Sequence, residues 1–169
     1  MKKMIATVGA CAVASLSFAS LGQASNETSA VNAKNVAAKQ CAAEKKADKA
    51  AFRATYGKHA MRNCIKGTTD EVKSESKAAS KDCKAQRDAD PQAFEDTYGK
   101  HGLGKCVSEQ VKDDSAAEVV DFKNAAKECK AERSADPEAF HTTYGTGHNG
   151  RNALGKCVSS KSHEDAEQS

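Results

Sequence analysis

The chain has 169 residues, of which 29% are charged and only 5% are aromatic, and it contains no tryptophan. Its 26 lysines and arginines outnumber its 23 aspartates and glutamates by three, and two of these lysines, Lys2 and Lys3, belong to the extreme N-terminus. Without them the net charge falls to +1, which excludes the strong electrostatic steering that is typical of nucleic-acid-binding proteins. We therefore expect no nucleic-acid partner.

The N-terminus has the features of a secretory signal peptide. Lys2 and Lys3 precede an uncharged run from Met4 to Ala24 that is rich in alanine and serine and ends in Gly-Gln-Ala. A positive start, an apolar middle and small residues before the cleavage point are typical of export signals. We predict a signal peptide at 1–24 and no membrane span after it. The alternative is an uncleaved anchor, which the serine and glycine content of the run disfavours.

One cysteine-bounded segment occurs three times in the rest of the chain. It reads CAAEKKADKAAFRATYGKHAMRNC from Cys41, CKAQRDADPQAFEDTYGKHGLGKCVS from Cys83 and CKAERSADPEAFHTTYGTGHNGRNALGKCVS from Cys129. An internal repeat of this kind defines the architecture. The predicted units are repeat 1 at 25–67, repeat 2 at 68–112, repeat 3 at 113–161 and a disordered tail at 162–169.

The cysteines predict one disulfide in each repeat. Cys11 lies in the signal peptide, so the seven cysteines of the chain become six after cleavage, two for each repeat. An even number in a small exported protein is typical of a disulfide framework. Units of roughly 40 residues bury too little surface to fold unaided, and a bridge of this loop length contributes about 3 kcal/mol. The predicted pairs are Cys41–Cys64, Cys83–Cys106 and Cys129–Cys157.

Each repeat is expected to contain three helices. Capping boxes at Thr68-x-x-Glu71 and Ser115-x-x-Glu118 predict the starts of the helices that carry Cys83 and Cys129. No stretch alternates polar and apolar residues with a period of two, as a strand would. The predicted fold class is all-α, with three tandem, small, disulfide-stapled helical modules and a flexible tail. Because the contacts are local, we also expect the modules to fold when they are expressed separately.

The second helix of each repeat has its own start signal. Asp90-Pro91 and Asp136-Pro137 match the N-cap and first residue of a helix, which explains these aspartates without any catalytic role. In repeat 1, Lys49 stands where the other repeats have proline, so its first two helices can run together.

The string C-K-A-E-R-x-A-D-P-E-A-F-x-x-x-Y-G…N-A-L-G-K-C-V-S in repeat 3 resembles a Cys-bounded helical repeat of uncharacterised secreted bacterial proteins. The likeness covers most of the chain after residue 24 and is strongest in repeats 2 and 3. It implies export, and it carries no activity.

Three histidines, His59, His101 and His148, occupy the same loop of the three repeats. Together with two cysteines, each could offer a ligand set to Zn²⁺ or Cu⁺. Export favours oxidised cysteines instead, and structural zinc usually has four ligands. Metal binding or buffering through these histidines is therefore the alternative function, and we predict no cofactor.

The remaining motifs favour a binding protein over an enzyme. The chain has no C-x-x-C, no haem-attachment motif and no G-x-S-x-G elbow, so no catalytic residue is predicted. We expect an exported, non-enzymatic repeat protein, secreted or located in the periplasm or cell envelope, that serves as a structural or multivalent binding module.

Its partner would be an acidic cell-surface polymer or a protein. Repeat 1 carries an excess of positive charge that could bind such an acidic polymer, and its only acids in this stretch are Glu44 and Asp48. Its basic residues are Lys39, Lys45, Lys46, Lys49, Arg53, Lys58, Arg62 and Lys66. The alternative is that these residues form an ordinary solvated helix face.

Overall fold

The computed structural model describes residues 31–146, 150 and 152–166, so the signal peptide predicted at 1–24 lies outside the described residues. Within these ranges the chain forms helices and no strand, and the all-α prediction is confirmed. The helices are α1 (Ala33–Ala47), α2 (Lys49–Tyr56), α3 (Ala60–Ala89), α4 (Pro91–Tyr98), α5 (Leu103–Ala135), α6 (Pro137–Tyr144) and α7 (Ala153–Ala166).

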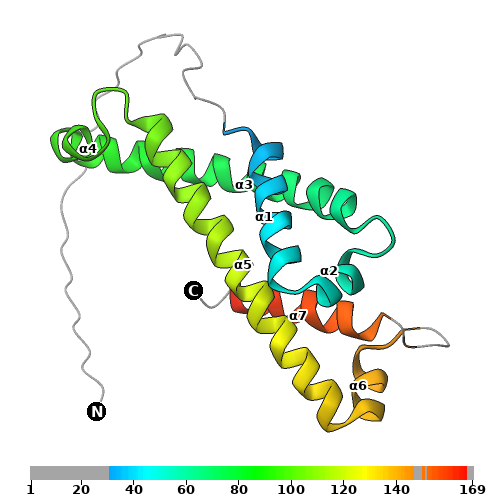
Figure 1. The fold of residues 1–169 in the computed structure, drawn as a ribbon. Helices are drawn as coiled ribbons and strands as arrows, with labels where there is room; N and C mark the ends of the chain where they lie inside the picture. The colour runs from blue at the N-terminus through cyan, green and yellow to red at the C-terminus, as the bar shows by residue number, and fades with distance from the viewer. Residues whose placement is uncertain (1–30, 147–149, 151, 167–169) are drawn as a thin grey trace, which may run out of the picture.

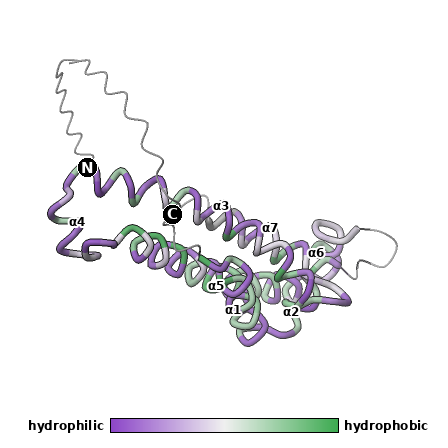
Figure 2. The backbone as a smooth tube through the Cα atoms, turned by 90° about the horizontal axis from the view of Figure 1, so that it is seen from above, coloured by the Kyte–Doolittle hydropathy of each residue, from purple (hydrophilic) through white to green (hydrophobic). Residues whose placement is uncertain are grey.

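Two long helices, α3 and α5, form the framework of the molecule. They pack against each other, and α4 joins them at one end (Figure 1). Helix α1 packs on both of them, and α7 packs on α5 and α2. Seen from above, α4 lies at one end of an elongated molecule, and α2 and α6 lie at the other (Figure 2). Among the described helices, none is both long and apolar enough to cross a membrane.

The long helices result from fusion across the predicted repeat boundaries. The third helix of repeat 1 and the first helix of repeat 2 are one helix, α3, and the same holds for repeats 2 and 3 in α5. The capping boxes predicted at Thr68 and Ser115 are therefore wrong, because both residues lie inside continuous helices. No proline lies between the start of either helix and the predicted capping residue, and extending a formed helix adds one hydrogen bond per residue.

Aspartate caps start the three short helices. Asp90 and Asp136 accept hydrogen bonds from the backbone N–H groups of Ala93 and Ala139, at 3.0 and 2.9 Å. In repeat 1 the first two helices do not run together, contrary to the sequence-based expectation. The Asp48 carboxylate caps α2 instead, so the chain turns there without a proline.

The three disulfides pair as the sequence predicts. Each one joins the first and third helices of its repeat, with Cα–Cα distances of 6.0, 6.1 and 5.9 Å, and all six cysteines are fully buried. The bridges are Cys41–Cys64, Cys83–Cys106 and Cys129–Cys157. They link α1 to α3, α3 to α5 and α5 to α7, so every long helix is tied at both ends.

Repeats 1 and 3 share a hydrophobic core. Phe52 of repeat 1 packs with Phe122 and Phe140 of repeat 3 in one cluster that includes the disulfides of both repeats. Repeat 2 has a separate, smaller cluster around Phe94 and Val111. The expectation of three separately folding modules is therefore not supported for repeats 1 and 3, because each completes the core of the other.

Part of the predicted tail is helical. Helix α7 continues to Ala166, which corrects the prediction of disorder for 162–166; residues 167–169 lie outside the described part of the chain. The helix is held at this end by packing on α5 and by the Lys161 ammonium, which pairs with Glu128 and Glu132 of α5.

Candidate functional site

The two described histidines of the three considered from the sequence, His59 and His101, belong to no group of side chains that could hold a metal ion. His59 is exposed at the N-cap of α3, His101 is exposed before α5, and His148 lies outside the described residues. The cysteine thiols are bound in disulfides and are not available as thiolate ligands. In the described part of the chain, no three His, Cys, Asp or Glu side chains are arranged to hold a metal ion.

Two of the hollows among the described residues combine clustered charges of one sign with other polar or aromatic side chains, and the first of them is basic. A hollow of about 640 Å³ lies in repeat 1 where α1, α2 and the start of α3 meet. Gly57, with φ at +74°, makes the turn between α2 and α3 that brings the cations together. We call this the basic hollow, and its charged lining consists of Lys45, Arg53, Lys58 and Arg62, with His59 beside them.

The basic hollow has an unbalanced charge. All four Lys and Arg side chains are exposed, and no carboxylate of a described residue lines the hollow or forms an ion pair with them. Repeats 2 and 3 do not reproduce it. The position of Arg53 holds Glu95 and His141 in the other repeats, and the position of Arg62 in repeat 2 holds Gly104.

The second hollow is acidic and lies where α1, α2, α3, α5 and α7 meet. It has a volume of about 390 Å³, and Glu44, Glu71 and Glu118 supply its charge. Its other lining residues are polar or aromatic: Gln40, Thr55, Tyr56, Gly67, Thr68, Phe122, Ser159, Ser162 and His163. We call it the acidic cavity. His163, which is exposed, is the one basic side chain among the described residues that line it.

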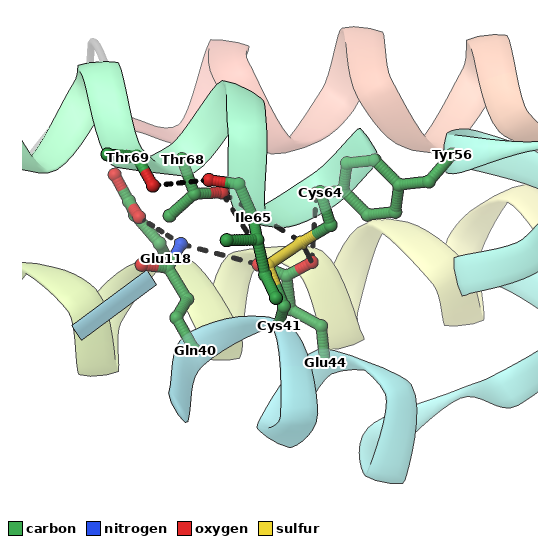
Figure 3. Close-up of a disulfide and its surroundings, with 9 residues drawn as sticks. All are labelled: Gln40, Cys41, Glu44, Tyr56, Cys64, Ile65, Thr68, Thr69 and Glu118. Carbon is green, nitrogen blue, oxygen red and sulfur yellow. Dashed lines mark hydrogen bonds between the residues drawn. A yellow bond between two sulfur atoms is a disulfide. The ribbon is translucent and has the colours of Figure 1, made fainter. Parts of the chain in front are cut away.

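Hydrogen bonds within the acidic cavity leave acceptors in excess. The Tyr56 hydroxyl donates to Glu44 Oε2 at 2.9 Å, and Gln40 Nε2 donates to Glu44 Oε1 at 3.3 Å and to Glu118 (Figure 3). Gln40 is only 5% exposed, and its Oε1 finds no donor among the described residues. The Thr55 hydroxyl, also in the lining, has no described partner either.

The carboxyl groups of Glu44, Glu75 and Glu118 at this junction have raised pKa values, and burial is the largest cause for each of them. Burial raises the pKa of Glu44, and the neighbouring Glu118 and Glu71 raise it further, against the opposing hydrogen bonds from Tyr56 and Gln40. Burial is also the main cause of the raised pKa of Glu118. Glu75, one helical turn after Glu71, is desolvated and faces the negative charge of Glu118, which raises the pKa of Glu75 to about 8.

Repeat 3 contains a counterpart of this arrangement with the opposite electrostatics. Glu132 stands three residues after Cys129 as Glu44 does after Cys41, and it accepts a hydrogen bond from Tyr144 at 3.2 Å. Here an ammonium is present: Lys161 Nζ lies 2.8 Å from Glu132 Oε1 and 3.3 Å from Glu128 Oε2. Its hydrogen bond is the main cause of the lowered pKa of Glu132.

In the sequence, Glu71 and Glu118 are recognisable only as members of capping boxes, and Glu44 only as an acid among the cations of repeat 1, although a signal for the site is present. Counted from the second cysteine of each repeat, the fourth following residue is Thr68, Gln110 and Lys161 in repeats 1, 2 and 3. The acid at Glu44 therefore lacks the lysine that its counterpart Glu132 has. The contribution of Glu118 had no local signal, because its partner Gln40 lies 78 residues away in the chain.

Comparison with known proteins finds no matching family model, no matching curated protein and no matching solved structure.

Proposed function

We propose that the protein is an exported, non-enzymatic binding protein that attaches to an anionic polymer of the cell envelope or extracellular space. The observation that carries this proposal is the basic hollow of repeat 1, where four exposed cations surround one concavity without a carboxylate from the described residues. Clustered charges of one sign attract a polyanion over about a Debye length, roughly 10 Å at 0.1 M salt.

Export is supported by the predicted signal peptide and by the three buried disulfides, which are typical of proteins that fold in an oxidising compartment. Because Arg53 and Arg62 are not repeated, the proposal places one anion site on the chain rather than three. Multivalent contact would then require several copies of the protein on one polymer.

The test measures binding to immobilised polyphosphate and alginate, which carry phosphate and carboxylate charges, with neutral dextran as the reference. We expect wild-type protein to bind at least one of the two polyanions, with an affinity that falls as NaCl rises from 50 to 300 mM. Arg53→Glu combined with Arg62→Glu should weaken binding about tenfold, because it reverses half of the charge of the hollow.

The matched control is Lys81→Glu combined with Lys84→Glu, which makes the same change in net charge on exposed positions of α3 in repeat 2. We expect this variant to keep most of the affinity. Equal losses in the two double variants would show attraction to net charge alone, and a wild-type protein that binds neither polyanion would refute the proposal.

A further inference from the structure

The acidic cavity has a charge imbalance that its counterpart in repeat 3 does not have. No lysine or arginine of the described chain enters this cavity of about 390 Å³, which is lined by three carboxyl groups. Glu44 is buried, Glu118 is half-buried and Glu71 is exposed. A buried or half-buried carboxylate without a counter-charge is costly. The missing component is therefore a cation.

A buried, unpartnered acceptor points in the same direction. Gln40 lines the cavity and is only 5% exposed. Its Nε2 donates to the carboxyl groups of Glu44 and Glu118, and its Oε1 has no donor among the described residues. Buried polar atoms without a partner are rare in native proteins. What the cavity lacks is a group with several N–H donors and a positive charge, as in an ammonium ion.

Repeat 3 shows how this chain satisfies such a site with an internal ammonium. Lys161 Nζ contacts Glu132 and Glu128, which are equivalent to Glu44 and Gln40 in repeat 1. The residue equivalent to Lys161 in repeat 1 is Thr68, which is 4% exposed and also lines the cavity. Threonine has a short, uncharged side chain, so repeat 1 has no internal ammonium at this position.

We propose that the acidic cavity binds the ammonium group of a small soluble primary amine, which takes the role that Lys161 has in repeat 3. The ligand would donate hydrogen bonds to Glu44, Glu118 and Gln40 Oε1. An organic amine fits better than a metal ion, because no three His, Cys, Asp or Glu side chains of the described residues converge on one point. The apolar stem of an alkylamine can lie against the aromatic lining of Tyr56 and Phe122.

The electrostatics of the junction predict how binding depends on pH. The titratable groups that line the site are Glu44 on α1, Tyr56 on α2, Glu71 on α3, Glu118 on α5 and His163 on α7. Glu75 on α3 and Asp114 on α5 lie outside the lining and interact with Glu118. The pKa values of Glu44 and Glu118 are raised, so acid pH protonates them and removes the charge that attracts the amine. Affinity should fall as pH falls, and binding should release protons at pH values where these carboxyl groups are partly protonated.

The test is calorimetry with 1,4-diaminobutane at 0.15 M NaCl, using the chain without residues 1–24 and with its disulfides intact. We expect wild-type protein to bind the diamine and to ignore 1,4-butanediol, which has the same stem and no charge. Proton release is read from titrations in two buffers with different ionisation enthalpies. This site is independent of the basic hollow, and no anionic polymer enters the experiment.

Two variants test the location of the site. Thr68→Lys supplies an internal ammonium and should weaken diamine binding at least tenfold, whereas Gln110→Lys, the same change at the equivalent position of repeat 2, should leave it unchanged. Glu118→Gln keeps the shape of the side chain and should weaken diamine binding about fivefold. If Thr68→Lys fails to fold, this variant tests whether the diamine binds in the acidic cavity.

Several results would overturn the proposal: no diamine binding to wild-type protein, equal binding to Thr68→Lys and wild-type protein, unchanged affinity in a folded Glu118→Gln variant, or tighter binding of CaCl2 than of the diamine in the same buffer.

Discussion

The acid sites of repeats 1 and 3 have the same starting geometry and opposite charge balance. In both, a glutamate three residues after the first cysteine accepts a hydrogen bond from a tyrosine twelve residues further along. Glu132 has the Lys161 ammonium beside it and a lowered pKa, whereas Glu44 is desolvated among other acids and has a raised pKa. One position, Thr68 against Lys161, accounts for the presence or absence of the internal cation.

This difference shows which properties a repeat preserves and which it does not. The disulfide, the phenylalanine and the tyrosine stay constant because they build the fold of each unit. The charges vary because they depend on which neighbouring helix lies beside the repeat. Glu118 reaches the site of repeat 1 from α5, in the segment predicted as repeat 3, so the acidic cavity depends on the packing of these two repeats against each other.

The acid sites of repeats 1 and 3 lie on one common core. Of the changes that we propose, removing a disulfide from this core should have the largest effect on stability. Cys41→Ala with Cys64→Ala and Cys83→Ala with Cys106→Ala each open a loop of the same 23-residue separation. Each pair of changes should lower the free energy of unfolding by about 3 kcal/mol in urea titrations.

The two disulfide variants should differ in where they loosen the protein. Cys41–Cys64 lies in the cluster that also contains Phe122 and Leu154 of repeat 3, so its loss should speed amide hydrogen exchange in α7. Loss of Cys83–Cys106, which lies in the other cluster, should spare α7. Unchanged exchange in α7 without Cys41–Cys64, or equal loosening in both variants, would contradict the shared core.

Local chemistry was predictable from the sequence, and the joining of local units was not. Asp90 and Asp136 were recognised as helix caps, and the cysteine pairing followed from two cysteines per repeat, because these features depend on nearby residues. Thr68 and Ser115 match capping boxes equally well, yet they lie inside helices because nothing before them ends the previous helix. Whether a cap signal is used depends on what precedes it.

The candidate sites follow the same division. The cations of the basic hollow were visible as a cluster in repeat 1, because all of them lie within 18 residues of the chain, from 45 to 62. The acidic cavity needs five helices to meet, and nothing in the sequence groups its acids together. Long-range packing of this kind has no periodic or local signature.

The excess of acid on the repeat 1 side predicts an effect of pH on stability. Glu75 has a pKa of about 8 in the folded protein against 4.5 ordinarily, so the folded state holds this proton more tightly than the unfolded state. The contribution of the Glu75 proton to stability is therefore full below pH 4.5 and is lost as pH rises toward 8. Glu75→Gln mimics the protonated form and should raise the free energy of unfolding at pH 9 by about 2 kcal/mol.

The measurement is urea unfolding of wild-type protein and Glu75→Gln at pH 5 and pH 9, with Glu109→Gln, an exposed position of α5, as the control for net charge. Wild-type protein and Glu75→Gln should have nearly equal free energies of unfolding at pH 5. A Glu75→Gln variant that is less stable than wild type at pH 9 would show that the charged carboxylate makes a favourable contact, and would remove the basis for an acid excess at this junction.

The smallest expected effect comes from making repeat 3 resemble repeat 1. Lys161→Thr removes the ammonium from Glu132 and Glu128, whose side chains are 41% and 59% exposed, so solvent already screens much of the attraction. The loss at pH 7 should be about 1 kcal/mol or less. Glu132 has a lowered pKa in the folded protein, so its contribution is present above pH 4.5 and disappears as pH falls below that value. The difference in stability between variant and wild type should therefore shrink at pH 3 and in 0.5 M NaCl.

An NMR titration should show the pKa of Glu132 rising in Lys161→Thr and staying unchanged in Lys156→Thr, an exposed control on the same helix. If the pKa of Glu132 did not move, the lysine would not be what distinguishes the two sites, and the reason for expecting an amine beside Glu44 would be lost.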